Sequence, residues 1–228
     1  MTAAPQQRQP PAAEGGSTAR RVLRAAGILA AVAFVALLAY GLTTKATDRT
    51  IDDALSRGEA VAAPGFTLDA LAGGRATGRP GELWRAAAAD GEVSLDELRG
   101  TPLVLNFWAS WCDPCRAEAE VLERAWRETG SREALFLGLD VQDAKEDARA
   151  FIGDFGLTFP HVRDPDKETQ RAWGVTGLPE TYFLSREGRV VGHVIGTVDE
   201  AQLREGIAAA RTGRPSGAAR GGEQRPAD

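Results

Sequence analysis

The most uniform apolar stretch of the chain lies near its N-terminus. Residues 25–42 carry no charged side chain, and apolar residues would occupy every face of a helix formed there. A helix of about 18–20 residues matches the hydrocarbon thickness of a bilayer. Four arginines precede the stretch, whereas bases and acids mix after it; they are Arg8, Arg20, Arg21 and Arg24. By the positive-inside bias, this pattern predicts a transmembrane anchor over residues 20–43, a cytoplasmic N-terminus and an extracytoplasmic remainder.

Two other interpretations of the apolar stretch are a signal peptide and a core helix. A cleaved signal peptide has a shorter apolar region and a clear small-x-small site, and residues 37–41 make a poor site of that kind. A core helix is disfavoured because residues 1–19 precede the stretch, and their Ala, Pro, Gln and Gly content is typical of disorder. The polar composition of residues 44–62 predicts a tether.

Beyond residue 63, apolar runs alternate with segments of helical spacing. The runs over 102–108 and 134–140 lack clean alternation, as expected for strands buried on both faces. Apolar residues recur at helical spacing over 113–129 and 144–155, which predicts a helix after each strand.

The remaining segments complete one domain over residues 63–211. Residues 66–71 alternate like an edge strand, and 73–91 are Gly- and Ala-rich, which predicts a loop insertion. A cap-like start predicts one helical turn at 94–98. The other expected elements are a short helix at 166–173, strands at 181–184 and 189–196 joined by a hairpin turn at 185–188, and a last helix at 198–210. We expect residues 212–228 to form a flexible tail.

The order of these elements indicates the architecture. Strands that alternate with helices, followed by a hairpin and a final helix, predict an α/β domain with a mixed central sheet and helices on both faces. The formal net charge of the 228 residues is −5, which argues against nucleic acid as a partner.

The only two cysteines stand three apart, at the start of the helix predicted over 113–129. Cys112 and Cys115 can cycle between dithiol and disulfide, and the helix N-terminus favours a thiolate on the first of them. A structural disulfide is the alternative, but a bridge across two residues constrains the unfolded chain very little. A zinc site needs three or four ligands, and His161 and His193 are remote. We therefore expect no metal and no cofactor other than this disulfide.

Four segments carry a resemblance to a known family. They are residues 106–115, which surround the cysteines, Ala63-Pro64-Gly65-Phe66, Phe159-Pro160 and Gly174-Val175-Thr176-Gly177-Leu178-Pro179-Glu180-Thr181. Together they resemble the thioredoxin superfamily, and within it the membrane-tethered TlpA/ResA/CcmG group. The resemblance covers residues 63–211, and the insertion at 73–91 departs from it. It implies a thioredoxin-like fold preceded by one transmembrane helix.

Both cysteines have expected roles in disulfide exchange. Cys112, at the helix N-terminus, is the expected attacking thiolate, and Cys115, one turn on and buried, resolves the mixed disulfide. Asp113 places a negative charge near Cys112, which should raise the pKa of its thiol and lower the reduction potential, whereas Arg116 acts in the opposite direction. The sequence therefore predicts a reducing centre.

Further site residues follow from the resemblance. Many thioredoxins keep a buried acid where Asn106 stands here, so Glu118, one turn beyond Cys115, is the expected proton-handling group; a solvated helix glutamate is the alternative. Leu178-Pro179 resembles the cis-proline segment that faces the cysteines, where Leu178 pairs with a substrate peptide.

Three side chains complete the predicted surroundings of the cysteines. Trp111 is expected on an exposed apolar rim around Cys112. Glu180 either adds polarity near the thiols or is an exposed residue at the start of a strand. His161, expected in a loop, and His193, expected in a strand, are interpreted as structural or solvated.

The resemblance implies an extracytoplasmic thiol–disulfide oxidoreductase that reduces apocytochrome c before haem attachment. Electrons would come from a membrane thiol transporter of the CcdA or DsbD kind. The alternatives are an oxidant or isomerase for secreted proteins, a peroxiredoxin-like peroxidase and a membrane-tethered binding protein. The peroxidase is disfavoured because its cysteine usually stands in a Thr-x-x-Cys context, which residues 108–112 do not match.

Overall fold

The computed structural model describes residues 16–44, 50–129 and 133–226. The chain divides into two compact units, residues 1–46 and 47–228. The first contains helix α1 (Gly16–Thr44), so the tail predicted over 1–19 ends in a helix, and its first fifteen residues lie outside the described part. Among the described residues, no helix is both long enough and apolar enough to cross a bilayer. The structure therefore does not confirm the anchor predicted over 20–43.

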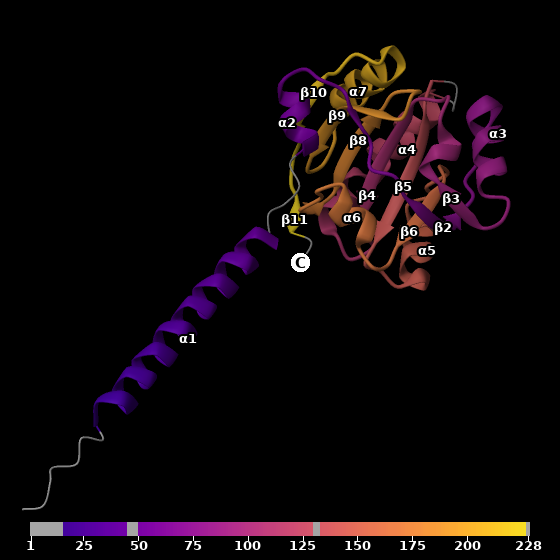
Figure 1. Cartoon of the computed structure of the whole chain (residues 1–228). Helices are drawn as coiled ribbons and strands as arrows, with labels where there is room; N and C mark the ends of the chain where they lie inside the picture. Colours follow the sequence, from indigo (N-terminus) through magenta and orange to yellow (C-terminus); the bar gives the residue numbers. More distant parts are fainter. Residues whose placement is uncertain (1–15, 45–49, 130–132, 227–228) are drawn as a thin grey trace, which may run out of the picture. The chain divides into compact units, whose positions relative to one another are not determined.

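The second unit is built on a mixed sheet (Figure 1). Its strand order is β1 (Val61–Ala62), β9 (Arg189–Ile195), β8 (Glu180–Leu184), β4 (Leu103–Trp108), β5 (Leu135–Val141), β6 (His161–Asp164), β2 (Thr67–Ala72) and β3 (Glu92–Ser94). The central strands β4, β5 and β6 run parallel, whereas β8 is antiparallel to β4 and to β9. Strands β4 and β5 are buried along their whole length, as their continuous apolar runs predict.

Helices cover both faces of this sheet. Tyr182 and Phe183 are neighbours on β8 and therefore point to opposite faces. A Cβ on Gly206 of α7 (Glu200–Thr212) would lie 2.3 Å from the Phe183 ring, so α7 covers one face. Tyr182 stacks on His193, which contacts Asp52 of α2 (Thr50–Ser56), so α2 covers the other. This confirms the predicted mixed sheet with helices on both faces.

Helix α4 (Asp113–Thr129) has the predicted bounds and packs beside α7. Its apolar stripe includes Ala119, Leu122 and Trp126, all of them buried. Two further predicted helices are shorter in the structure, namely α5 (Lys145–Asp154) and α6 (Glu168–Ala172). The helix predicted at 94–98 is the 3₁₀ turn η1 (Leu95–Leu98), which begins with a capping box from Ser94 and Glu97.

Three expectations on the N-terminal side of the cysteines are wrong. The insertion 73–91 contains a helix, α3 (Gly78–Ala87), because Trp84 is buried against the core and orders the segment. Strand β2 is not an edge strand, since it lies between β6 and β3. The tether over 44–62 supplies α2 and β1, and Ile51 and Leu55 are buried in the core. The domain therefore begins before residue 63.

The predicted flexible tail at 212–228 is also wrong over its described part. Helix α7 runs to Thr212, β10 (Gly217–Arg220) pairs in parallel with β9, and β11 (Arg225–Pro226) pairs with β7 (Gly177–Leu178). Strand pairing through the backbone needs no apolar pattern, so hydropathy gave no signal. A Cβ on Gly221 would lie 2.2 Å from the Thr197 carbonyl oxygen, so its glycine allows this approach.

Candidate active site

The two cysteines form a disulfide at the start of α4, with sulfur atoms 1.97 Å apart. Cys112 is 0% exposed and Cys115 is 2% exposed. The backbone N–H of Cys115 donates to Cys112 Sγ over 3.2 Å. A free N–H group of the first helical turn is thus directed at the sulfur, which is the contact that stabilises a thiolate there after reduction.

The loop before Cys112 is fixed to the loop that follows β5. Asp143 accepts hydrogen bonds from Ser110 N at 2.6 Å and from Ser110 Oγ at 2.9 Å. Trp111 Nε1 donates to the carbonyl of Gln142 at 3.0 Å, and Arg116 donates to the carbonyl of Ser110 at 2.7 Å. These contacts hold the backbone that precedes Cys112, and none of them involves a sulfur atom.

Glu118 is buried behind the cysteines, with 2% of its surface exposed. Its carboxyl accepts hydrogen bonds from Asn106 Nδ2 at 2.8 Å and from Val198 N at 2.9 Å. Burial raises the pKa of Glu118 to about 8, and these two hydrogen bonds oppose the rise only in part. The structure excludes the solvated alternative. Glu118 titrates in the range of an ordinary thiol and lies one helical turn from Cys115.

Asn106 also borders a small cavity beside Cys115. The cavity, about 10 Å³, is lined by Trp108 and His161 as well. His161 is 0% exposed, and its two ring nitrogens have no hydrogen-bond partner among the described residues. Burial lowers the pKa of His161 to about 3, so the imidazole is neutral. The sequence placed this residue in a loop, because the four-residue strand β6 has too few positions to show a period.

The predicted cis-proline segment meets the cysteine loop at the same end of the sheet. The Leu178–Pro179 peptide bond is cis, as predicted. Glu180, the next residue, pairs with Phe107 near the end of β4, and β4 leads directly into the cysteine loop. The strand pairing therefore places Pro179 level with the residues that precede Cys112.

Glu180 is not the exposed residue that was one of its two interpretations. It is 1% exposed and accepts six hydrogen bonds. The donors are Thr176 N at 3.1 Å, Thr176 Oγ1 at 3.5 Å, Gly177 N at 3.3 Å, Tyr182 OH at 3.1 Å, Gln224 Nε2 at 2.8 Å and His193 Nε2 at 2.9 Å. The Glu180 carboxylate thus ties together the cis-proline segment, β8, β9 and the C-terminal segment.

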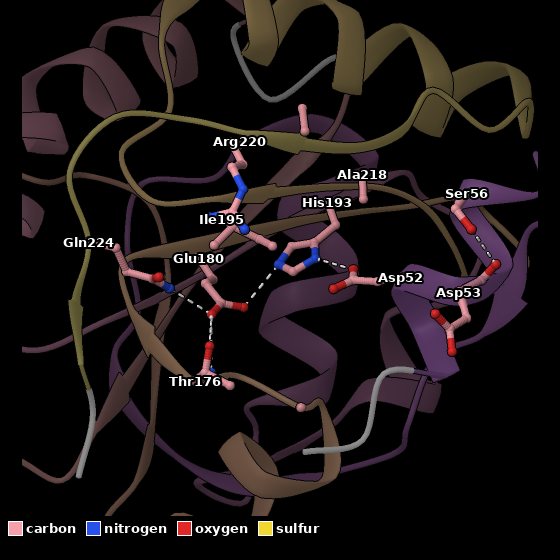
Figure 2. Close-up of a pocket in the computed structure, with 12 residues that line it drawn as sticks. Asp52, Asp53, Ser56, Thr176, Glu180, His193, Ile195, Ala218, Arg220 and Gln224 are labelled. Atoms are coloured by element: carbon pink, nitrogen blue, oxygen red, sulfur yellow. Dashed lines mark hydrogen bonds and ion pairs between the residues drawn. The ribbon is translucent and has the colours of Figure 1, made fainter. Parts of the chain in front are cut away.

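His193 lies between two carboxylates, as Figure 2 shows. Its Nδ1 is 2.7 Å from Asp52 Oδ1, and its ring stacks on Tyr182 at 3.9 Å between centroids. Burial alone would lower the pKa of His193, but the bonds to Asp52 and Glu180 outweigh it and raise that pKa. Burial and the Glu180 charge raise the pKa of Tyr182. The sequence gave no signal for the Asp52 contact, because the pair is 141 residues apart.

The polar pocket of Figure 2 adjoins this cluster and has a volume of about 490 Å³. Asp52, Asp53, Thr176, Glu180 and His193 line it, together with the C-terminal segment. Neither cysteine lines the pocket. No group of three or more His, Cys, Asp or Glu in the described ranges is arranged to hold a metal ion.

The predicted site residues therefore fall into two groups that the sheet brings together. Trp111, Cys112 and Cys115 belong to the cysteine loop and the start of α4, with Glu118 behind them. Leu178, Pro179 and Glu180 form the facing segment. Trp111 is half-buried, and the guanidinium of Arg225 lies 5.2 Å from its ring centroid, so the rim is not open as expected.

The sequence and the fold are similar to those of known proteins. The AhpC/TSA family model matches residues 61–193. Thiol-disulfide oxidoreductase ResA of Bacillus subtilis (strain 168) is 30% identical over 125 residues, which are 55% of this chain and 70% of ResA. Thiol:disulfide interchange protein DsbE of Pseudomonas fluorescens biotype C is 29% identical over 138 residues, 59% of this chain and 75% of DsbE. ResA of Bacillus thuringiensis (strain Al Hakam) is covered over 65% of its length.

Two solved structures share the fold. MTB DsbF, in mixed oxidised and reduced forms, superposes with a TM-score of 0.52 at 26% identity, over 64% of this chain and 95% of DsbF. A DsbF homologue from Corynebacterium diphtheriae gives a TM-score of 0.53 at 26% identity, over 67% of this chain and 88% of that protein. The expected thioredoxin-like fold is confirmed.

Proposed function

The chain belongs to the AhpC/TSA family and is a thiol–disulfide oxidoreductase with a thioredoxin-like fold, and from this premise we propose that it works as a reductant of protein disulfides. The observation that carries the proposal is the Cys112–Cys115 disulfide at the N-terminus of α4, level with cis-Pro179. A thiolate formed there is stabilised by helix N–H groups and meets a backbone edge on which a peptide can pair.

The proposed reaction moves two electrons from the cysteine pair to the substrate. The Cys112 thiolate attacks one sulfur of the substrate disulfide, which forms a mixed disulfide and releases the other sulfur as a thiolate. The Cys115 thiolate then attacks Cys112 Sγ, which closes the Cys112–Cys115 disulfide and releases the second substrate thiolate. Glu118 is the proposed proton-handling group for Cys115, because it is buried one turn away and its pKa of about 8 lets it exchange a proton at neutral pH.

The reducing direction is supported by Asp113 in the first turn of α4. A carboxylate beside Cys112 disfavours the thiolate, and so favours the disulfide form. Equilibration with glutathione should give a potential nearer to that of thioredoxin, about −270 mV, than to that of DsbA, about −120 mV. Asp113→Asn should raise the potential, and Glu120→Gln on the exposed side of α4 serves as the control. A wild-type potential at the DsbA end would make the protein an oxidant.

The proposed substrate is an apocytochrome c whose haem-binding cysteines are joined in a disulfide. The resemblance to the TlpA/ResA/CcmG group supports this, as does similarity to ResA and DsbE. The reduced protein should reduce a Cys-x-x-Cys-His disulfide peptide faster than a peptide of the same composition in scrambled order. Equal rates for the two peptides would indicate a general disulfide reductase with no preference for the haem-binding sequence. The proposed electron donor is a membrane thiol transporter of the CcdA or DsbD kind, and it should reduce the wild type but not Cys112→Ser.

The proposed location is extracytoplasmic, with residues 20–43 as the membrane anchor. The uncharged stretch 25–42 and the arginines before it support this, although the described helices do not. Alkaline phosphatase fused after the last residue should be active in a bacterial host, whereas a cytoplasmic reporter at the same site should be inactive. The opposite result would remove the proposed location and anchor orientation.

A further inference from the structure

The C-terminal segment is fastened to the domain along its described length, although its composition predicts a flexible tail. Ser216 N donates to the Val191 carbonyl at 2.8 Å, and β10 then pairs with β9 over four residues. Beyond β10, Gly221 N donates to the Ile195 carbonyl at 2.8 Å, and Glu223 accepts a bond from Thr197 N at 3.0 Å. These contacts bring the next residues to the end of the sheet at which β4 leads into the cysteine loop.

Residues 223–226, which we call the strap, end against the cis-proline segment. Arg225 pairs with Leu178 and Pro226 pairs with Gly177, in antiparallel register. Arg225 Nη1 also donates to the Trp111 carbonyl at 2.7 Å, and its guanidinium lies over the Trp111 ring. Arg225 therefore joins the cis-proline strand to the residue that precedes Cys112. Leu178 is the residue expected to pair with a substrate.

The body and the tail are shaped for this contact on both sides. A Cβ on Gly177 would lie 2.7 Å from Gln224 Cδ, and a Cβ on Gly196 would lie 2.4 Å from the Gly222 carbonyl oxygen. Gln224 in turn donates to the buried carboxylate of Glu180 at 2.8 Å. The glycines leave room for the tail, and Gln224 satisfies a buried acceptor next to Pro179.

We propose that the strap is an internal occupant of the substrate-peptide site, so that a substrate strand reaches Cys112 only by displacing it. This rests on the proposed function, because the displaced position is the one assigned to the substrate. The complete burial of Cys112 agrees with a covered site. The strap carries no cysteine, so it occupies the site without reacting.

The strap also indicates which peptides compete for the site. It is extended, it presents a guanidinium to the Trp111 ring, and it presents an amide to Glu180. A substrate that places Arg or Lys over Trp111 gains the same cation–π contact. We therefore infer that extended segments with a basic residue beside the disulfide are preferred over acidic ones.

The rate at which dithiothreitol reduces the Cys112–Cys115 disulfide tests the strap without any protein substrate. A chain ending at Gly222 removes the strap but keeps β10, and Arg225→Ala removes only the contacts to Trp111. Arg214→Ala is the matched control, since it removes an exposed arginine from the same tail. We expect the shortened chain to react about tenfold faster and Arg225→Ala about threefold faster, because one or two net hydrogen bonds are lost. Arg214→Ala should match the wild type.

Equal rates for the wild type, the shortened chain and Arg225→Ala would overturn the strap, even if reductase activity is normal. Conversely, faster reduction with no activity on disulfide peptides would keep the strap and remove the proposed function. Arg225→Ala decides the case if the shortened chain fails to fold. As a second measurement, a synthetic peptide of residues 223–226 should slow the shortened chain, and the same peptide with Ala for Arg225 should slow it less. No difference between the peptides would contradict the specificity assigned to Arg225.

Discussion

Two buried glutamates lie on opposite faces of the same sheet, and their surroundings differ. Glu118 and Glu180 are exposed by 2% and 1%. Glu118 accepts two hydrogen bonds, from neutral donors, and Asn106 connects it to Thr181 on one face of β8. Glu180 accepts six hydrogen bonds, one of them from His193. It lies with Tyr182 on the other face of β8.

The difference shows how one residue type acquires two roles. Burial without a cation raises the pKa of Glu118 to about 8, so that it can take up and release protons near neutral pH. Glu180 has an imidazole partner whose pKa is raised and a full set of donors, which suits a carboxylate that fixes the cis-proline segment in place. Proton exchange therefore belongs to the face covered by α4, and positioning of the cis-proline segment belongs to the face covered by α2.

Glu118→Gln should have the largest effect. In the wild type, the unfolded state releases this proton near pH 4.5 and the folded state near pH 8. The folded state thus holds the extra proton between these values, and the stability that it provides is lost as the pH rises through that window. The loss is on the order of 5 kcal/mol, at about 1.36 kcal/mol per pKa unit. Urea unfolding from pH 4 to 9 should show a smaller decline for Glu118→Gln than for the wild type.

The same variant also tests the proposed proton-handling role. Glu118→Gln should shift the pH profile of Cys115 alkylation in the reduced protein, whereas Glu120→Gln, on the exposed side of α4, should not. An unchanged Cys115 profile in Glu118→Gln would leave Glu118 a structural role only.

Glu180→Ala should have the next largest effect. It should lower the free energy of unfolding by about 3–5 kcal/mol, because it leaves His193 buried beside a cavity and several donors without an acceptor. Urea unfolding at pH 7 measures the loss, with Glu120→Ala as the exposed control. The pH profile of Cys115 alkylation should stay as in the wild type. If Glu180→Ala instead shifted that profile as Glu118→Gln does, the two faces would not have separate roles.

His193→Gln should have a smaller effect on stability, confined to a different pH range. The pKa of His193 is raised on folding, so its contribution is fully present below the unfolded value of 6.5 and is lost as the pH rises through the folded value. Between pH 4.5 and 6.5 the variant should lose stability in parallel with the wild type, and above pH 6.5 its decline should be shallower. Parallel curves above pH 6.5 would show that His193 is not ion-paired.

Asn106→Ala should give the smallest change, and it tests how the hydrogen bond from Asn106 affects the pKa of Glu118. The hydrogen bond from Asn106 lowers the pKa of Glu118, so its loss should move that pKa higher still. Titration of the Glu118 carboxyl by isotope-edited infrared spectroscopy would measure the shift. Glu187, an exposed carboxyl, should titrate unchanged in the same samples.

Local patterns predicted the parts of the site that lie within one element. The cysteine pair, the bounds of α4 and the cis bond before Pro179 were accessible because a spacing, an apolar stripe and a motif mark them. The contact from His193 to Asp52 could not be predicted, because only tertiary packing joins β9 to α2, a short helix within the expected tether. The strap was missed for a related reason, since backbone pairing leaves no periodicity in a segment of Glu, Gln, Arg and Pro.

The central claim is that Cys112 is the sulfur that attacks and Cys115 the one that resolves. Reduced Cys115→Ser, mixed with a Cys-x-x-Cys-His disulfide peptide, should form a one-to-one adduct on Cys112 that dithiothreitol releases and mass spectrometry locates. Cys112→Ser under the same conditions should remain unmodified. An adduct on Cys115 of the Cys112→Ser variant, or no adduct on Cys115→Ser, would contradict the account.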